Sequence, residues 1–392
     1  MEITTEMIPI DASELLRLAQ SLIRIPSVNP PGDEAAVATY LAEYLRRAGL
    51  AVEVTEVQRG RPNLLATLEF GDGPTVLLNG HTDVVVPGEG WLADPFAGNV
   101  NDGKLFGRGA ADMKGPLAAM IEAMLALKRS GLVHRGRLIL TAVMGEEYGG
   151  LGTKDLVRRG IRADHAIVGE PSELRPVIAH KGTIRFEIVV EGKAAHGSVP
   201  EAGLNAIYKM MDVVAELRSL HTRLSANRHP LVGSPTLNVG TIAGGLGTCI
   251  VPDRCAITID RRVVPGEPVE NVGRELEAIL GRLRARDPEL RATLTLQNIA
   301  PAMEISADQP VVHAIRRATA AVTGKDPGVH GWTATADSNL LVNELGIPTV
   351  IFGPGSIFGV AHQPNEYVAV AELDAAARIY ALTLRDLLQD GM

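Results

Sequence analysis

Short, continuous apolar runs alternate with longer amphipathic segments through the first 180 residues, and this alternation constrains the fold more than any other feature. The apolar runs have the length and composition of strands that are buried on both faces. They lie at 63–69, 75–79, 137–144 and 165–169. The amphipathic segments have helical spacing, and they lie at 12–24, 33–48, 116–129 and 152–159. We therefore predict an α/β domain whose mixed sheet is sandwiched by helices.

The pattern changes near residue 180, where "GTIRFEIVVEG" alternates apolar and polar residues as a half-exposed strand does. From here the predicted order is β-α-β-β-α-β, which is typical of a ferredoxin-like sandwich. One stripe of its first helix is predicted to contain Leu204, Ile207, Met210, Met211, Val214 and Leu217. Helices near 309–323, 337–345 and 371–388 then resume the first pattern. The predicted organisation is a discontinuous domain, 1–179 and 298–392, with a domain at 180–297 inserted into it.

Composition excludes several classes of protein. The net charge is −8 and Lys/Arg runs are absent, so we expect no nucleic-acid partner. No run of about 18 apolar residues is present, so we expect no membrane partner. The N-terminal stretch lacks the basic and apolar regions of a signal peptide. Two cysteines make no disulfide framework, which favours a reduced, cytoplasmic location.

Potential metal ligands recur directly after the predicted strands or in a glycine-rich loop that opens a helix. They are His81, Asp83, Asp112, Glu146, Glu147, Glu170 and His362. Any one of them alone is more often a solvated or capping residue than a ligand. In open α/β sheets, however, ligands bind outside the carboxyl ends of the strands. Five segments with this placement therefore predict one cationic centre, and the competing prediction is a set of solvated turns that bind no metal.

The types of ligand indicate which cation is bound. Imidazole and carboxylate groups without a thiolate favour Zn, Mn or Co. The groups are too many for one tetrahedral Zn, so they suit two divalent ions that share a bridging carboxylate. A ligating imidazole usually donates its other N–H to a carboxylate or carbonyl group, and Asp83 is well placed to accept it from His81.

Several motifs together resemble the di-zinc deacylase and exopeptidase family. They are "SVNPPGDE", "NGHTDVVVP", "GRGAADMKG", "GEEYGGLGT", "GEPS", "GKAAHGSVPEAGLNAI" and "AHQPNEYV", and they span nearly the whole chain. This family includes acetylornithine deacetylase, succinyl-diaminopimelate desuccinylase, aminoacylase and glutamate-type carboxypeptidases. The resemblance implies a metal-dependent hydrolase, with Zn expected and Co or Mn as alternatives.

The resemblance also implies a role for each ligand. Asp112 would bridge the metals, His81 and Glu170 would complete one site, and Glu147 and His362 would complete the other. The peptide bond after Asp112 is expected to be cis.

Further roles come from the same resemblance. Glu146 would be the general base. Asp83, predicted above to orient His81, would support this catalytic centre. The inserted domain would act as a lid and would form a homodimer. Its His196 would reach the active site of the other subunit and stabilise the oxyanion.

The substrate would be a small N-acyl amino acid or a short peptide. The residues expected to bind it are Arg262, Asp337, Asn339, Gly353 and Gly355, the two glycines through free backbone N–H groups. Cys249 and Asn339 replace an asparagine and an arginine that are common in deacylases, which leaves the specificity open. A deacylase is the leading hypothesis. A dipeptidase or carboxypeptidase is the alternative, and a non-catalytic metal-binding relative is a remote one.

Overall fold

The structure is a computed structural model that describes residues 8–389, and it divides into two compact units. The first unit contains the chain up to Ile178, Ile305–His330 and the chain from Ala336 onward. The second contains Ala179–Glu304 and Gly331–Thr335, so it extends beyond the predicted limit of residue 297. The signal-peptide prediction rests partly on residues 1–7, which lie outside the described residues. Within 8–389, no helix is long and apolar enough to cross a membrane.

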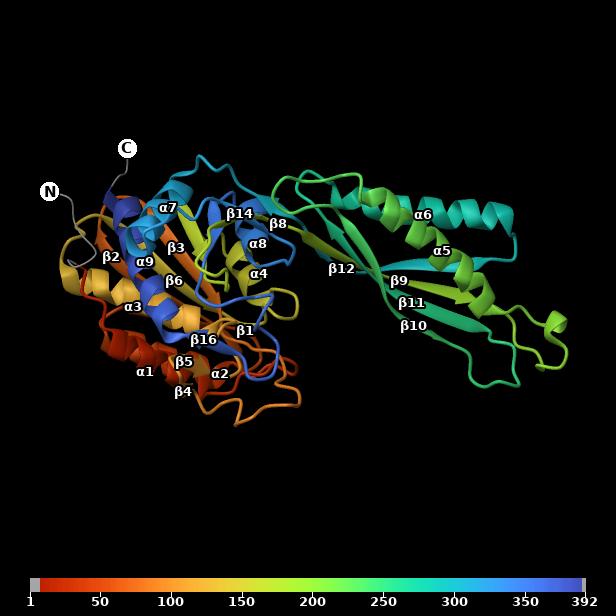
Figure 1. The fold of residues 1–392 in the computed structure, drawn as a ribbon, viewed down its shortest axis with the longest axis horizontal. Coiled ribbons are helices and arrows are strands. Elements are labelled where there is room, and N and C mark those ends of the chain that lie inside the picture. The colour runs from red at the N-terminus through yellow and green to blue at the C-terminus, as the bar shows by residue number, and fades with distance from the viewer. Residues whose placement is uncertain (1–7, 390–392) are drawn as a thin grey trace. The chain divides into compact units, whose positions relative to one another are not determined.

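Most strands of a mixed sheet belong to the first unit (Figure 1). The strand order is β1-β2-β6-β3-β7-β15-β8-β13, and β14 also pairs with β8; β13 and parts of β8 and β14 belong to the second unit. The strands are β1 Ala51–Gln58, β2 Arg61–Gly71, β3 Thr75–His81, β6 Gly136–Val143, β7 His165–Val168, β8 Val177–His180, β13 Met303–Glu304, β14 His330–Trp332 and β15 Thr349–Ile351. The central strands β6, β3, β7 and β15 are parallel. Their carboxyl ends therefore lie at one edge of the sheet.

The helices of the first unit agree with the amphipathic segments to within a few residues. They are α1 Ala12–Ile23, α2 Ala35–Arg47, α3 Lys114–Ser130, α4 Leu151–Arg158, α7 Pro310–Thr323, α8 Ser338–Asn343 and α9 Val370–Gln389. The Asp11 carboxylate caps α1 by accepting from the N–H groups of Ser13 and Glu14. Gly131, at φ 61°, ends α3 in the left-handed conformation.

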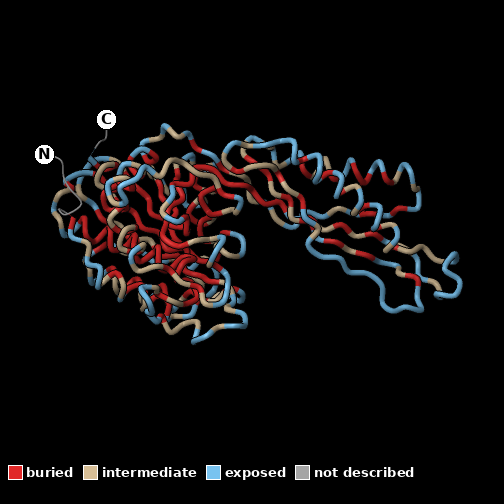
Figure 2. The backbone as a smooth tube through the Cα atoms, viewed as in Figure 1, coloured by how far each residue is buried: buried red, intermediate tan, exposed pale blue. Residues whose placement is uncertain are grey.

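Right-handed crossovers place α3 and α4 on opposite faces of the sheet. The chain moves from β3 through α3 to β6, and then back across β3 through α4 to β7. Every residue of β3 is buried, as expected for a strand covered on both faces. Figure 2 shows the buried backbone of this unit gathered around its central strands.

A small second sheet in the first unit was not predicted. It has the order β16-β5-β4, from Tyr367–Ala369, Lys104–Phe106 and Asn99–Asn101. Strands of three residues are too short to produce a periodic pattern in the sequence.

The second unit has the predicted β-α-β-β-α-β order. Its elements are β9 Gly182–Glu191, α5 Ala206–Leu224, β10 Thr236–Gly244, β11 Arg254–Val263, α6 Val269–Arg286 and β12 Arg291–Ala300. The antiparallel sheet has the order β10-β11-β9-β12, and α5 and α6 contribute to a common hydrophobic core with it. The prediction that Met211 faces this core is wrong, because its side chain is 62% exposed.

Candidate metal centre

The predicted ligands of the first unit converge at the carboxyl ends of the parallel strands. His81 ends β3, Glu146 and Glu147 follow β6, and Glu170 follows β7. Two sets of ligand atoms lie close enough together to hold a metal ion. In each set all atoms are within 4.8 Å of one another, the sets being His81, Asp112 and Glu147, and His81, Glu146 and Glu170.

Asp112 lies between the two histidines. Its Oδ1 atom is 3.0 Å from Nε2 of His81, and its Oδ2 atom is 3.2 Å from Nε2 of His362. The Nε2 atom of His362 is also 3.1 Å from Oε1 of Glu147. Each oxygen of one carboxylate thus faces a different imidazole, as a carboxylate that bridges two cations would. The peptide bond between Asp112 and Met113 is cis, which confirms that expectation.

Glu170 and Glu146 lie on the His81 side of the cluster. Oε1 of Glu170 is 3.6 Å from Nε2 of His81. Glu146 belongs to the same set of ligand atoms as these two residues, although the resemblance implies that it is the base rather than a ligand. The three residues are therefore close enough for Glu146 to lie beside a metal ion held by His81 and Glu170.

Asp83 supports the centre with both its backbone and its side chain. Its carbonyl group accepts from Nδ1 of His81 at 2.8 Å, which leaves Nε2 of that ring facing Asp112. Its carboxylate accepts from the backbone N–H of Glu146 at 3.1 Å and of Glu147 at 3.2 Å. Asn29 donates to the same carboxylate at 2.8 Å. Asp83 thus orients His81 and also fixes the turn that carries both glutamates.

Burial and mutual repulsion shift the pKa values of the clustered acids. Burial, with the neighbouring carboxylate of Glu170, raises the pKa of Glu146 well above its ordinary value. Burial and Asp112 likewise raise the pKa of Glu170. Hydrogen bonds to Asp112 and Glu147 raise the pKa of His362 to about 10. Burial also acts to raise the pKa of Asp112, but hydrogen bonds from His362 and His81 outweigh it and lower that pKa.

This set of donors fits two divalent cations. Like-charged carboxylates are costly to bury unless a counter-charge neutralises them. His81, Asp112 and Glu170 are each nearly or fully buried, and they offer one imidazole and two carboxylates. A second combination, Asp112, Glu147 and His362, shares Asp112 with the first. Imidazole with carboxylate is the donor chemistry that suits Zn, Mn or Co.

Glu366 is a residue near the centre that the sequence analysis missed. It lies four residues after His362 in "AHQPNEYV", and its carboxylate accepts from the backbone N–H groups of Ala111 and Asp112 at 2.9 and 3.1 Å. Burial raises the pKa of Glu366 to about 7. The sequence did contain a signal for Glu366, because it is an acidic residue in a motif that already supplies a predicted ligand.

The predicted substrate-binding residues of the first unit have other contacts. The N–H of Gly353 donates to Ser172 at 3.0 Å, and the N–H of Gly355 donates to Glu372 at 2.9 Å. Both donors are occupied, which is contrary to the prediction that they are free to bind a carboxylate. Asp337 accepts from the Thr153 hydroxyl at 2.6 Å.

Asn339 is also buried, with 4% of its surface exposed. It lies in the first turn of α8, one residue after the start of that helix.

His196 and Arg262 lie in the second unit. Nδ1 of His196, an exposed residue, is 2.7 Å from the Ser198 hydroxyl. Arg262 donates twice to the carboxylate of Asp260, at 2.6 and 3.2 Å. Its neighbour Arg261 is fully buried and pairs with Glu267, so the two arginines face opposite sides of β11 as predicted.

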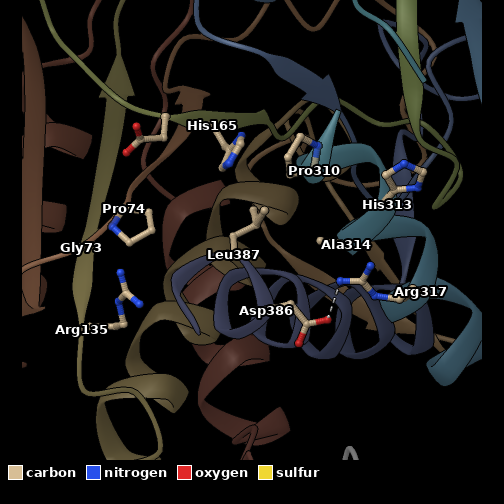
Figure 3. Close-up of a pocket in the computed structure, with 11 residues that line it drawn as sticks. Gly73, Pro74, Arg135, His165, Pro310, His313, Ala314, Arg317, Asp386 and Leu387 are labelled. Atoms are coloured by element: carbon tan, nitrogen blue, oxygen red, sulfur yellow. Dashed lines mark hydrogen bonds and ion pairs between the residues drawn. The ribbon is translucent and has the colours of Figure 1, made fainter. Parts of the chain in front are cut away.

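A pocket of about 630 Å³ opens at the amino ends of the parallel strands of the large sheet (Figure 3). It is lined by residues that precede strands, such as Pro74 before β3 and Arg135 before β6, together with residues of α7 and α9. The predicted metal ligands follow the carboxyl ends of the same strands. The pocket therefore lies at the opposite ends of the strands from these residues.

Known proteins resemble this chain over most of its length. It is 34% identical over 371 residues to an acetylornithine deacetylase from Proteus mirabilis, covering 92% of this chain and 93% of that protein. It is 33% identical over 399 residues to an N-formyl-4-amino-5-aminomethyl-2-methylpyrimidine deformylase from Halalkalibacterium halodurans, covering 92% and 91%. The fold is similar to that of an M20 family metallo-carboxypeptidase from Sulfolobus solfataricus, with a TM-score of 0.82, 22% identity and coverage of 95% and 98%.

Residues 77–386 match the family model described as peptidase family M20/M25/M40. With the relatives above, this match identifies a metallo-hydrolase fold whose members act on amide bonds. The chain therefore belongs to peptidase family M20/M25/M40.

Proposed function

We propose that this protein hydrolyses the amide bond of a small N-acyl amino acid with the help of two divalent metal ions. The observation that carries the proposal is the position of Asp112, whose two carboxylate oxygens face the imidazoles of His81 and His362. The names of two relatives, a deacetylase and a deformylase, both describe removal of a small acyl group. They support an N-acyl substrate over a peptide.

His81, Asp112 and Glu170 would hold one metal ion, and Asp112, Glu147 and His362 would hold the other. We propose zinc as the metal, with cobalt or manganese as alternatives. When bound, two such cations supply Lewis-acid chemistry, because they acidify water and polarise a carbonyl group.

Glu146 is the proposed general base. Its carboxylate would take a proton from the attacking water and later give it to the leaving amine. Its backbone N–H is fixed by Asp83, so the side chain starts from a defined position. The products would be a carboxylic acid and an amine.

The second unit is proposed to act as a lid and as the surface of a homodimer. By resemblance to the family, its His196 would stabilise the oxyanion, and its Arg262 would bind the substrate carboxylate. Apolar side chains that are exposed on α5 and β10 support dimerisation, namely Tyr208, Met211 and Ile242 at 69%, 62% and 60%. β10 is also an edge strand of its sheet.

A substrate panel tests the proposed function. N-formyl, N-acetyl and N-succinyl amino acids would be compared with dipeptides, each with added Zn, Co or Mn. The proposal predicts that kcat/KM is higher for at least one N-acyl amino acid than for every dipeptide. Preference for dipeptides would favour the peptidase alternative, and no turnover of any amide would favour the non-catalytic one.

A further inference from the structure

The loop that carries Asp112 wraps around a single residue, Glu366. The Glu366 carbonyl accepts from the N–H of Gly107 at 2.9 Å. Its Oε1 atom accepts from the N–H groups of Gly109, Ala111 and Asp112 at 3.1, 2.9 and 3.1 Å. Every donor in this set comes from residues 107–112, so Glu366 holds the loop that leads to Asp112 at four points, three of them through one carboxylate oxygen.

The second oxygen of Glu366 is held by an equally buried cation. Arg108 donates through Nη1 to Oε2 at 2.5 Å, and Glu366 and Arg108 are 0% and 1% exposed. The guanidinium also donates to the carbonyl of Pro87 at 3.1 Å and lies over the ring of Trp91. Breaking such a buried pair on one side leaves an uncompensated polar group, so these contacts resist rearrangement.

The segment that contains Glu366 also carries His362, and it is tied down at other points. Asn365 accepts from the N–H of Leu92 at 2.8 Å and donates to the carbonyl of Gly90 at 3.2 Å. Directly after Glu366, Tyr367 pairs with Phe106 in the small sheet. His362 therefore begins a short segment whose far end is fixed to the Asp112 loop.

We propose that Glu366 is a positioning residue that fixes Asp112 and His362 relative to each other before metal binds. The inference rests on the proposed metal centre and adds a residue that touches neither metal nor substrate. Ligands that are already held in place lose less conformational freedom on binding, so the same donors bind metal more tightly. Residues that orient ligands in this way typically contribute about 10–100-fold to metal affinity.

The variant Glu366→Gln tests this role with little change in volume. An amide has one acceptor oxygen, so its NH₂ group must face either the three backbone N–H groups or the Arg108 guanidinium. Glu122→Gln is a matched control, because Glu122 is also buried, pairs with Arg129 and accepts from the backbone N–H of Asp11. Glu122 lies within α3, away from the loop at 107–112.

Metal affinity and the visible spectrum of the cobalt(II)-loaded protein are measured for both variants, without using turnover. We expect Glu366→Gln to bind metal about 10–100-fold more weakly, with an altered cobalt spectrum. We expect Glu122→Gln to keep wild-type affinity and spectrum even where its melting temperature falls. Wild-type affinity in Glu366→Gln, or equal losses in the two variants, would overturn the inference.

Metal binding by the wild-type protein and folding of the variant are checked first, because the inference rests on the proposed metal centre. If the wild-type protein binds no metal, the proposed centre and this inference both fail. If Glu366→Gln does not fold, Glu366→Asp keeps the charge and shortens the side chain by one methylene. Weakened metal binding by folded Glu366→Asp would support the positioning role, and wild-type binding would overturn it.

Discussion

The Nε2 atom of His362 lies 3.2 Å from Oδ2 of Asp112, although the two residues lie in loops far apart in the sequence. His81 faces the other oxygen of the same carboxylate at 3.0 Å. Asp112 is thus the shared member of the cluster, and the predictions below follow from the different positions of the groups around it.

Glu146→Gln is expected to lower kcat by about 10²–10⁴-fold, which is the usual contribution of a general base. The metal content should remain that of the wild-type protein, because the proposed ligands are unchanged. Steady-state kinetics would measure kcat, and metal analysis of the same preparation would measure the metal content. Wild-type kcat in this variant would remove Glu146 from the role of base.

Glu147→Gln should act on metal binding, in contrast to Glu146→Gln. Glu147 contacts His362 at 3.1 Å and is a proposed ligand, so its loss should weaken binding of one metal by more than the roughly 10–100-fold typical of outer residues. Equilibrium titration with zinc against a chelating indicator measures this change. Two metals bound with undiminished affinity would contradict the assignment.

Asp83→Asn should lower kcat while the fold is retained. The carboxylate accepts from the N–H groups of Glu146 and Glu147 and from Asn29, and an amide would turn a donor toward at least one of these donors. Leaving one buried donor unsatisfied costs about 1–3 kcal/mol. Chemical denaturation and kinetics would be compared. Unchanged stability and kcat together would show that Asp83 does not fix the glutamate turn.

Metal binding should release at least one proton per chain at pH 7–8. The pKa of His362 in the metal-free protein is raised to about 10 by Asp112 and Glu147, so the imidazole is protonated at this pH and must lose its proton to bind metal. The apparent metal affinity should therefore rise with pH, about tenfold per unit for each proton released, up to about pH 10.

Calorimetry in buffers of different ionisation enthalpy counts the released protons. The raised pKa of His362 also stabilises the folded state of the metal-free protein. This contribution to the free energy of unfolding is fully present below the ordinary histidine pKa of about 6.5, and it is lost as the pH rises through about 10. Zero proton release would contradict a charged His362 in the metal-free protein.

The sheet, the helices and the proposed ligands were predictable because each depends on local pattern. The apolar run of β3 predicts a buried strand, and the position of His81 at the end of that strand made it a candidate ligand. The resemblance supplied the roles of Glu146 and Glu147, which composition alone does not distinguish.

Other features depend on contacts between distant segments, and the sequence did not reveal them. Gly353 and Gly355 looked like free donors, but Ser172 and Glu372 occupy their N–H groups. Met211 has helical spacing compatible with the core, yet it lies outside the arc that α5 buries. No role was predicted for Glu366, because only the folded chain brings it to residues 107–112.

The number of metal ions bound per chain tests the central claim most directly. Wild-type protein and Asp112→Ala would be loaded with zinc, separated from free metal by gel filtration and measured by mass spectrometry of the metal. The account predicts two ions per wild-type chain and at most one weakly held ion in Asp112→Ala, because both proposed sites share that carboxylate. Fewer than two ions in the wild-type chain, or two in Asp112→Ala, would contradict it.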